Sequence, residues 1–261
     1  MKLRSQFFSR DIGAYRLAEP DMVITSEPKT YSDSDGFAKE FSIADIAETF
    51  RVSSHVGRWA QSDLEDFADS GRVPDPVHLA TKIRDLLNSF VVFPKPEQAA
   101  LVALWIMATY MFELFNAFPY LHLFGPAGSG KTKLLSVLSQ LVYNPVFTGN
   151  ISLAAMFRVV EATAGTVLLD EAEILGTDFG VEHKLLLNGG YKKGACVYRM
   201  EQGEGGRFGI REFNIFSPKA LGSINALPGT LGSRCIQIQT LPAKGHASSK
   251  LVDLESTSFQ A

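Results

Sequence analysis

A glycine-rich segment constrains this chain more than any other feature of its sequence. Gly125-Pro126-Ala127-Gly128-Ser129-Gly130-Lys131-Thr132 fits the pattern G-x-x-x-x-G-K-[ST], in which glycines let backbone N–H groups turn inward around an anion. In this pattern the lysine ammonium binds the β- and γ-phosphates of a nucleotide, and the last hydroxyl binds Mg²⁺. The segment therefore predicts ATP and Mg²⁺ as cofactors, with residues 125–132 as the binding loop.

The residues on either side of this loop have the patterns of a strand and a helix. Tyr120-Leu121-His122-Leu123-Phe124 is a short apolar run typical of a buried strand. After the loop, apolar residues recur at helical spacing, at Leu134, Leu135, Val137, Leu138, Leu141 and Val142. A helix that starts at the loop would direct its positive end toward the phosphates.

A second motif is an apolar run that ends in two acids, Gly165-Thr166-Val167-Leu168-Leu169-Asp170-Glu171. A buried parallel strand of this form delivers its terminal acids to one edge of a sheet. Mg²⁺ prefers hard oxygen ligands, so Asp170 joins Thr132 as a predicted metal ligand. Glu171 is placed to polarise an attacking water, which makes it, with Lys131, a predicted catalytic residue. The two motifs together predict a Mg²⁺-dependent ATPase.

With Leu231-Gly232-Ser233-Arg234-Cys235 further along the chain, these motifs resemble the AAA+ class of P-loop ATPases. Residues 119–241 also resemble the ATPase domain of plasmid- and phage-type replicative helicases and their uncharacterised bacterial relatives. The resemblance implies a three-layer α/β domain with a mostly parallel five-stranded sheet. It further implies a homo-oligomeric ring, for example a hexamer, that acts on single-stranded or duplex DNA.

The same resemblance assigns roles to two later segments. In clamp-loader members of the class, a Ser-Arg-Cys triplet carries an arginine finger, so Arg234 is expected to enter a neighbouring subunit's site. Residues 219–225 are expected to form the fourth core strand, whose end holds the polar residue that reads the γ-phosphate. Asn225 and Ser223 are both candidates, and spacing does not choose between them.

An insertion before that strand is predicted to form a β-hairpin, at about residues 195–217. Cys196–Met200 and Ile210–Phe216 are strand-like, and Gln202–Gly206 is the turn. The hairpin resembles the pore hairpin of helicase-type AAA+ proteins, and the basic residues of the region suit a groove for single-stranded DNA: Lys192, Lys193, Arg199, Arg207 and Arg211. Glu201 and Glu204 favour the alternative, a solvated hairpin without a ligand.

The flanking regions are less informative. Residues 1–75 form a weakly patterned region in which residues 42–60 fit either a helix-turn-helix or, as we favour, an ordinary helical hairpin. Residues 76–118 are predicted to be a helical layer, and their apolar run, 99–112, is short for a membrane span. Residues 242–261 form a polar tail with no helical lid, either because such a lid is missing from the family or because the chain is truncated.

The composition is consistent with a cytoplasmic protein that has no membrane partner. The net charge is −3 and the chain has only two cysteines, so neither a general affinity for nucleic acid nor a disulfide framework is indicated. Two rival functions remain open at this level. One is an AAA+ remodeller that acts on protein, and the other is a DNA-binding regulator that nucleotide switches.

Overall fold

The computed structural model describes residues 6–8, 13–17, 22–25, 30–31, 34–40, 66, 70, 74–172, 181–202, 206–227 and 229–242. The chain divides into two compact units, one built around residues 1–75 and the other around residues 76–260. The segment 42–60, for which a helix-turn-helix is one interpretation, and the tail from residue 243 onward lie outside the described residues.

The first unit contains a small antiparallel sheet. Its strands pair in chain order, and the helix α1 (Ser34–Glu40) follows them; the strands are β1 (Gln6–Phe8), β2 (Gly13–Leu17), β3 (Met22–Thr25) and β4 (Thr30–Tyr31). The weak sequence pattern of residues 1–75 did not indicate a sheet of this size.

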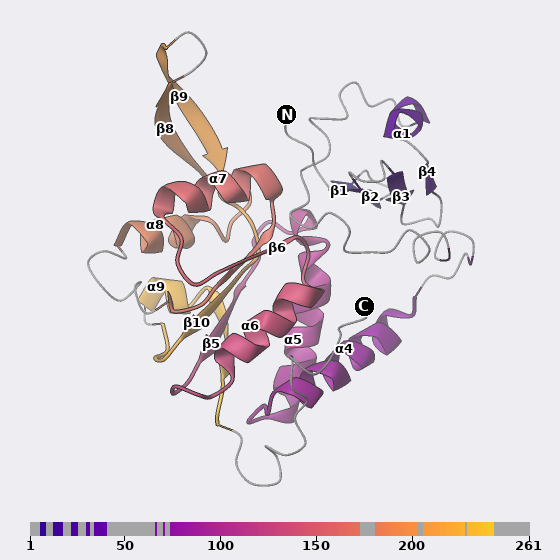
Figure 1. Ribbon diagram of the computed structural model, residues 1–261, viewed down its shortest axis with the longest axis vertical. Coiled ribbons are helices and arrows are strands. Elements are labelled where there is room, and N and C mark those ends of the chain that lie inside the picture. Colours follow the sequence, from indigo (N-terminus) through magenta and orange to yellow (C-terminus); the bar gives the residue numbers. More distant parts are fainter. Residues whose placement is uncertain are drawn as a thin grey trace. The chain divides into compact units, whose positions relative to one another are not determined.

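The second unit is built on a parallel sheet of five strands. These are β5 (Tyr120–Phe124), β6 (Pro145–Thr148), β7 (Thr166–Leu169), β10 (Lys219–Ser223) and β11 (Cys235–Gln239). They lie in the order β11-β5-β10-β7-β6, and every neighbouring pair is parallel. The predicted α/β class with a mostly parallel five-stranded sheet is confirmed. Because the strands are parallel, their carboxyl ends meet at one edge (Figure 1).

Helices cover both faces of this sheet. They are α4 (Pro76–Phe90), α5 (Pro96–Thr109), the 3₁₀ turn η1 (Phe112–Leu114), α6 (Lys131–Leu141), α7 (Leu153–Thr163), α8 (Val181–Gly189) and α9 (Gly229–Gly232). Leu221 and Gly222 are consecutive on β10 and so face opposite sides. Leu221 packs in a cluster with residues of α7, α8 and α9, whereas a Cβ on Gly222 would lie 3.1 Å from Leu135 of α6.

Helices α4 and α5 extend the α6 side, since α4 packs against both α5 and α6. The apolar run 99–112, part of the predicted helical layer, lies mostly in α5. Trp105 on this helix is buried and its indole N–H donates to the Pro119 carbonyl, 2.9 Å away, just before β5. Within the described residues, none of the helices combines the length and the apolar character that crossing a bilayer would require.

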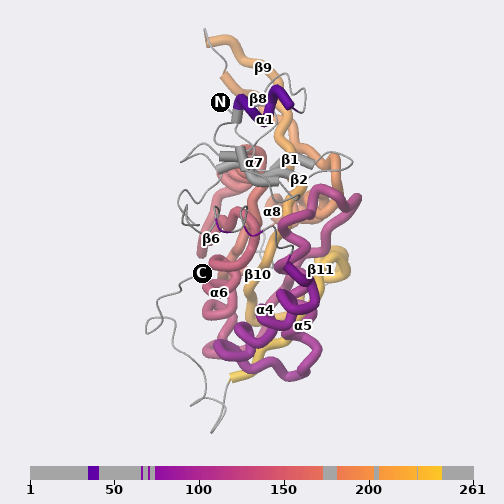
Figure 2. Tube along the Cα trace, turned by 90° about the vertical axis from the view of Figure 1, so that its right-hand side faces the viewer, coloured from indigo at the N-terminus to yellow at the C-terminus, as the bar shows by residue number. Residues whose placement is uncertain are grey.

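A two-stranded hairpin, β8 (Cys196–Gln202) and β9 (Phe208–Asn214), is inserted between α8 and β10. It extends beyond α7 and away from α4, α5 and α6 in both views (Figures 1 and 2). The predicted hairpin is confirmed, but both strand predictions were wrong in extent. The Gln202–Phe208 pair lengthens the ladder toward the tip. At its other end β9 stops at Asn214, whose side chain accepts the Phe216 N–H at 2.9 Å.

Candidate active site at the carboxyl edge of the sheet

The glycine loop joins β5 to α6, as the sequence predicted. Gly128 and Gly130 have left-handed φ angles of 73° and 89°, which glycine adopts at no steric cost. Gly125 is required for a different reason: a Cβ there would lie 2.3 Å from the Thr240 carbonyl oxygen. Gly130 is also the cap from which α6 starts, and its carbonyl accepts the Leu134 N–H at 2.9 Å.

Neighbouring strands hold the base of the loop. The hydroxyls of Ser129 and Thr240 share a buried hydrogen bond of 2.7 Å, and the Thr240 N–H donates to Phe124 at 2.8 Å. On the other side, the Gly125 N–H donates to the Ser223 carbonyl at 3.2 Å. The sequence did not indicate Thr240, because its role depends on the parallel pairing of β11 with β5.

The two predicted metal ligands lie together. The Thr132 hydroxyl donates to Asp170 Oδ2 at 2.7 Å, although the residues come from different elements, α6 and the end of β7. Adjacent oxygens around an octahedral Mg²⁺ are about 2.9 Å apart, given Mg–O distances near 2.1 Å. The oxygen pair therefore fits a Mg²⁺ site that phosphate and water oxygens would complete. Gly222 allows this arrangement, since a Cβ there would lie 3.1 Å from Asp170 Oδ1.

The Lys131 ammonium lies within the loop itself. It donates to the carbonyls of Gly125 at 2.7 Å and Pro126 at 2.9 Å. Both partners are neutral carbonyls. A phosphate brought to the same loop would offer this ammonium a charge-assisted and stronger hydrogen bond.

Glu171 has a backbone conformation that is uncommon for its residue type. Its φ is 57°, in a region where a residue other than glycine costs about 1–3 kcal/mol and where active-site residues are often found. Its N–H donates to Asp170 Oδ1 at 3.1 Å, and its side chain is exposed. The two acids thus project differently: Asp170 toward Thr132, and Glu171 into the open part of the site.

These groups surround one pocket of about 660 Å³. Its walls include Lys131, Thr132, Asp170 and Glu171 from the two motifs, and the residues that sequence reasoning missed are Gly149, Asn150, Ile151, His183 and Ile224. Gly149, Asn150 and Ile151 follow β6 and His183 lies on α8. The only signal that could have pointed to these residues is the rule that ligands bind at the carboxyl ends of parallel strands.

Neither candidate for the γ-phosphate reader lines this pocket; Ile224, between them, does. Ser223 is buried and its hydroxyl donates to the Asn225 carbonyl at 2.6 Å. Since that hydroxyl has one hydrogen, His122 Nε2, 2.7 Å away, must donate to Ser223. His122 is fully buried on β5, and burial lowers its pKa to about 4. Ser223 thus fixes the end of β10, and the Asn225 side chain is exposed.

Arg234 lies against its own chain. Its guanidinium stacks on the Tyr191 ring at 4.5 Å and donates to the Asn188 carbonyl at the end of α8. The adjacent Cys235 is largely buried, which raises the pKa of its thiol to about 12. Arg234 is not among the residues that line the pocket, so a role in catalysis would require a pocket on another subunit.

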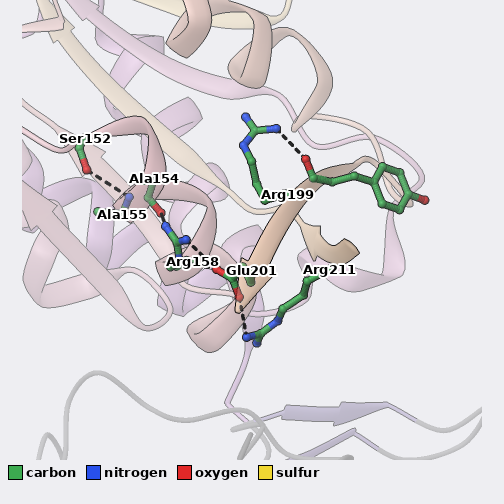
Figure 3. Close-up of polar contacts among 8 residues, drawn as sticks. Ser152, Ala154, Ala155, Arg158, Arg199, Glu201 and Arg211 are labelled. Atoms are coloured by element: carbon green, nitrogen blue, oxygen red, sulfur yellow. Dashed lines mark hydrogen bonds and ion pairs between the residues drawn. The ribbon is translucent and has the colours of Figure 1, made fainter. Parts of the chain in front are cut away.

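Two arginines of the hairpin, Arg199 and Arg211, contact groups of the second unit, and Figure 3 shows Glu201 between Arg158 and Arg211. Arg199 and Arg211 form a cross-strand pair and lie over the rings of Phe157 and Phe213, at 5.1 and 4.8 Å. Glu201 on the same face accepts from Arg211 at 3.0 Å and from Arg158 of α7 at 2.6 Å. The hydrogen bond from Arg158 is the main reason why the pKa of Glu201 lies below its usual value.

The opposite face of the hairpin is apolar. Paired residues share a face, so Met200 opposite Ile210 and Tyr198 opposite Glu212 point away from Arg199. Phe208 and Ile210 are 68% and 75% exposed, and Tyr198 and Met200 are also mainly in solvent. We call Tyr198, Met200, Phe208 and Ile210 the outer face of the hairpin. Arg199 and Arg211 therefore lie on the opposite face of the hairpin from these apolar side chains.

The pocket brings together a flexible ammonium, a hydroxyl, two carboxylates and a helix start. This set of groups can bind a polyanion with its counter-cation and place a carboxylate beside an attacking water. Neither a protein-family model nor a curated protein matches this chain, and the geometry of the pocket carries the functional argument.

Proposed function

We propose that the chain is a Mg²⁺-dependent ATPase of the P-loop type. The observation that carries this proposal is the approach of Thr132 to Asp170, 2.7 Å between oxygens, in the pocket that Lys131 and Glu171 also line. The two motifs are distant in sequence, and chance glycine loops and chance acid-ended strands have no reason to converge on one pocket.

Each side chain has a distinct part in the proposed reaction. Lys131 would leave the carbonyls of its own loop and bind the terminal phosphates, where it offsets their charge. Thr132 and Asp170 would hold Mg²⁺, which when bound neutralises the phosphate oxygens. Glu171 would accept a hydrogen bond from the attacking water and orient it toward the γ-phosphorus. The test is phosphate release from ATP with Mg²⁺ and with EDTA; no release in either condition would reject the proposal.

We further propose that hydrolysis drives movement or unwinding of DNA by a ring, as the helicase resemblance implies. Arg207 is an exposed cation near the hairpin tip, and the aromatic rings of Tyr198 and Phe208 can stack on bases. A second candidate, a remodeller of proteins, is favoured by the apolar outer face of the hairpin. Stimulation of the ATPase by single-stranded DNA supports the first, and stimulation by an unfolded polypeptide supports the second.

The ring itself can be tested through Arg234. Lys131→Ala keeps the arginine but disables the loop, and Arg234→Ala does the reverse. If Arg234 completes the site of a neighbouring subunit, mixing the two inactive proteins should restore part of the ATPase activity. The contacts of Arg234 with Tyr191 and Asn188 suggest a control: melting curves must show that Arg234→Ala remains folded. Full activity of Arg234→Ala alone would reject the finger.

A further inference from the structure

We propose that His183 is a positioning residue that holds the segment 149–151 as a wall of the pocket that the glycine loop also lines. This inference rests on the proposed ATPase function and extends it to residues outside both motifs. His183 and Gly149–Ile151 come from different elements, α8 and the connection after β6, yet both line the pocket with Asp170 and Glu171.

The hydrogen bond between these two elements fixes the chemistry of His183. Its Nε2 lies 3.0 Å from the Ile151 carbonyl oxygen. A carbonyl can only accept, so Nε2 carries the hydrogen and donates it. The other ring nitrogen, Nδ1, is buried and has no hydrogen-bond partner among the described residues. The polar contact of the imidazole within this part of the chain is therefore the one that anchors the segment.

The segment that His183 holds is short and is fixed at its other end by Thr148. The Thr148 hydroxyl donates to the Asn150 carbonyl at 2.7 Å, and the Asn150 N–H donates to the Thr148 hydroxyl oxygen at 3.2 Å. The Thr148 carbonyl in turn accepts the Asp170 N–H at 3.0 Å. Thr148 thus ties the start of the segment to the acid-bearing strand, and His183 ties its end to α8.

Between these two anchors, the Asn150 side chain is exposed at the pocket. Its amide makes no hydrogen bond to another described residue and can donate to a phosphate oxygen or accept from a water. An anchored wall would hold this amide in one place during turnover. We therefore assign the terminal-phosphate side of the pocket to Asn150, with His183 as the residue that positions it.

The two ring nitrogens allow a sharp experiment. His183→Gln places a donor close to the position of Nε2, His183→Asn places one close to that of Nδ1, and His183→Leu provides neither. If the Nε2 hydrogen bond positions the wall, Gln should retain most of kcat, whereas Asn and Leu should each lower kcat by about 10²-fold, as a misplacement of about 1 Å can do. Because bound ADP lacks the terminal phosphate, its affinity should change by less than about threefold.

Ser152→Ala is the matched control. The Ser152 hydroxyl accepts the Ala155 N–H at 3.2 Å and caps α7 directly after the segment, so its removal should lower the melting temperature without lowering kcat. A wild-type protein that hydrolyses no ATP would reject the proposed function itself. If wild type is active, equal kcat values for His183→Leu and wild type, or a loss with Gln as large as with Leu, would overturn the role of His183. A non-additive effect of Asn150→Ala on His183→Leu would support it.

Discussion

The glycine loop and the hairpin were both recognised from sequence, and both contain the charged residues that their proposed roles require, but the structure uses these charges differently. In the loop, Lys131 contacts neutral carbonyls and lines an open pocket. In the hairpin, Arg199 and Arg211 lie over aromatic rings, and Glu201 occupies Arg211 and Arg158. A charge that its own chain engages is less available to a ligand, so a count of basic residues does not by itself identify a ligand-binding face.

The largest effect is expected at the loop. Lys131→Ala should abolish ATP binding, because the remaining groups of the pocket cannot offset the charge of the terminal phosphates. The side chain is partly exposed and lies outside the core, so the melting temperature should be nearly unchanged. Calorimetric titration with ATP and a thermal melt measure the two quantities. Undiminished binding would show that the loop does not hold the phosphates.

A smaller effect is expected at Glu171. The change Glu171→Gln keeps the shape of the side chain but removes its ability to act as a base, and should lower turnover by about 10²- to 10⁴-fold. ATP affinity should be retained, because Lys131 and the loop remain. The measurement is kcat together with a binding titration. Turnover at the wild-type rate would show that Glu171 is not the catalytic carboxylate.

The hairpin should respond face by face. If it binds single-stranded DNA, Arg199→Ala with Arg211→Ala should leave the salt dependence of binding nearly unchanged, because these cations face α7 and its aromatic neighbours. Arg207→Ala should reduce the salt slope by about 0.7 for each phosphate that the arginine neutralises. Tyr198→Ser with Phe208→Ser should weaken binding at all salt concentrations.

The measurement is DNA affinity over a salt series for each variant. A salt slope that falls when Arg199 and Arg211 are removed would mean that these exposed cations contact DNA phosphates directly. Stimulation of the ATPase by unfolded polypeptide, but not by DNA, would favour the remodeller function, with the outer face of the hairpin as the polypeptide-binding surface.

Residues close in sequence were the ones whose structure could be predicted. The glycines of the loop from Gly125 to Thr132 determine its backbone geometry. The apolar residues from Leu134 onward have a helical spacing, and they form the buried side of α6. The pairing of the acids with the loop was predictable because a parallel sheet aligns its strand ends. Asn150, His183 and Thr240 were not predictable, since each acts through one hydrogen bond or contact between elements that no local pattern encodes.

The sequence also could not show which face of the hairpin would pack against the rest of the unit. Alternation divided β8 and β9 into two faces, but the more apolar face would ordinarily be expected inside. Here Arg199 lies over Phe157 of α7, and Glu201 bridges Arg158 of α7 and Arg211, so the charged face is the one that contacts α7. Only the position of α7 decides this orientation.

The last expected effect is on stability rather than on ligand binding, and concerns Lys219, where the chain returns from the hairpin to the strand that ends at the pocket. Its ammonium is fully buried and donates to the Ile215 and Ser217 carbonyls, each at 3.0 Å, and to the Ser217 hydroxyl at 3.1 Å. The Tyr120 ring lies 5.1 Å away. Burial lowers the pKa of Lys219 from 10.5 to about 7.

This shift fixes the sign of a pH effect. Between about pH 7 and 10.5 the unfolded chain holds the Lys219 proton while the folded chain has released it, so this group makes the free energy of unfolding rise with pH across that window. Below pH 7 both states are protonated and the cost of the buried charge is constant. Lys219→Met removes this contribution, so the stability of the variant relative to wild type should be greatest near pH 6 and should decline toward pH 10. Urea titrations at several pH values measure this difference, with Lys192→Met, an exposed lysine, as the control that should show no such trend.

A difference that stays constant with pH would mean that the three acceptors keep Lys219 charged despite its burial. The hydrogen bonds from Lys219 to Ile215 and Ser217 would then stay charge-assisted across the whole pH series.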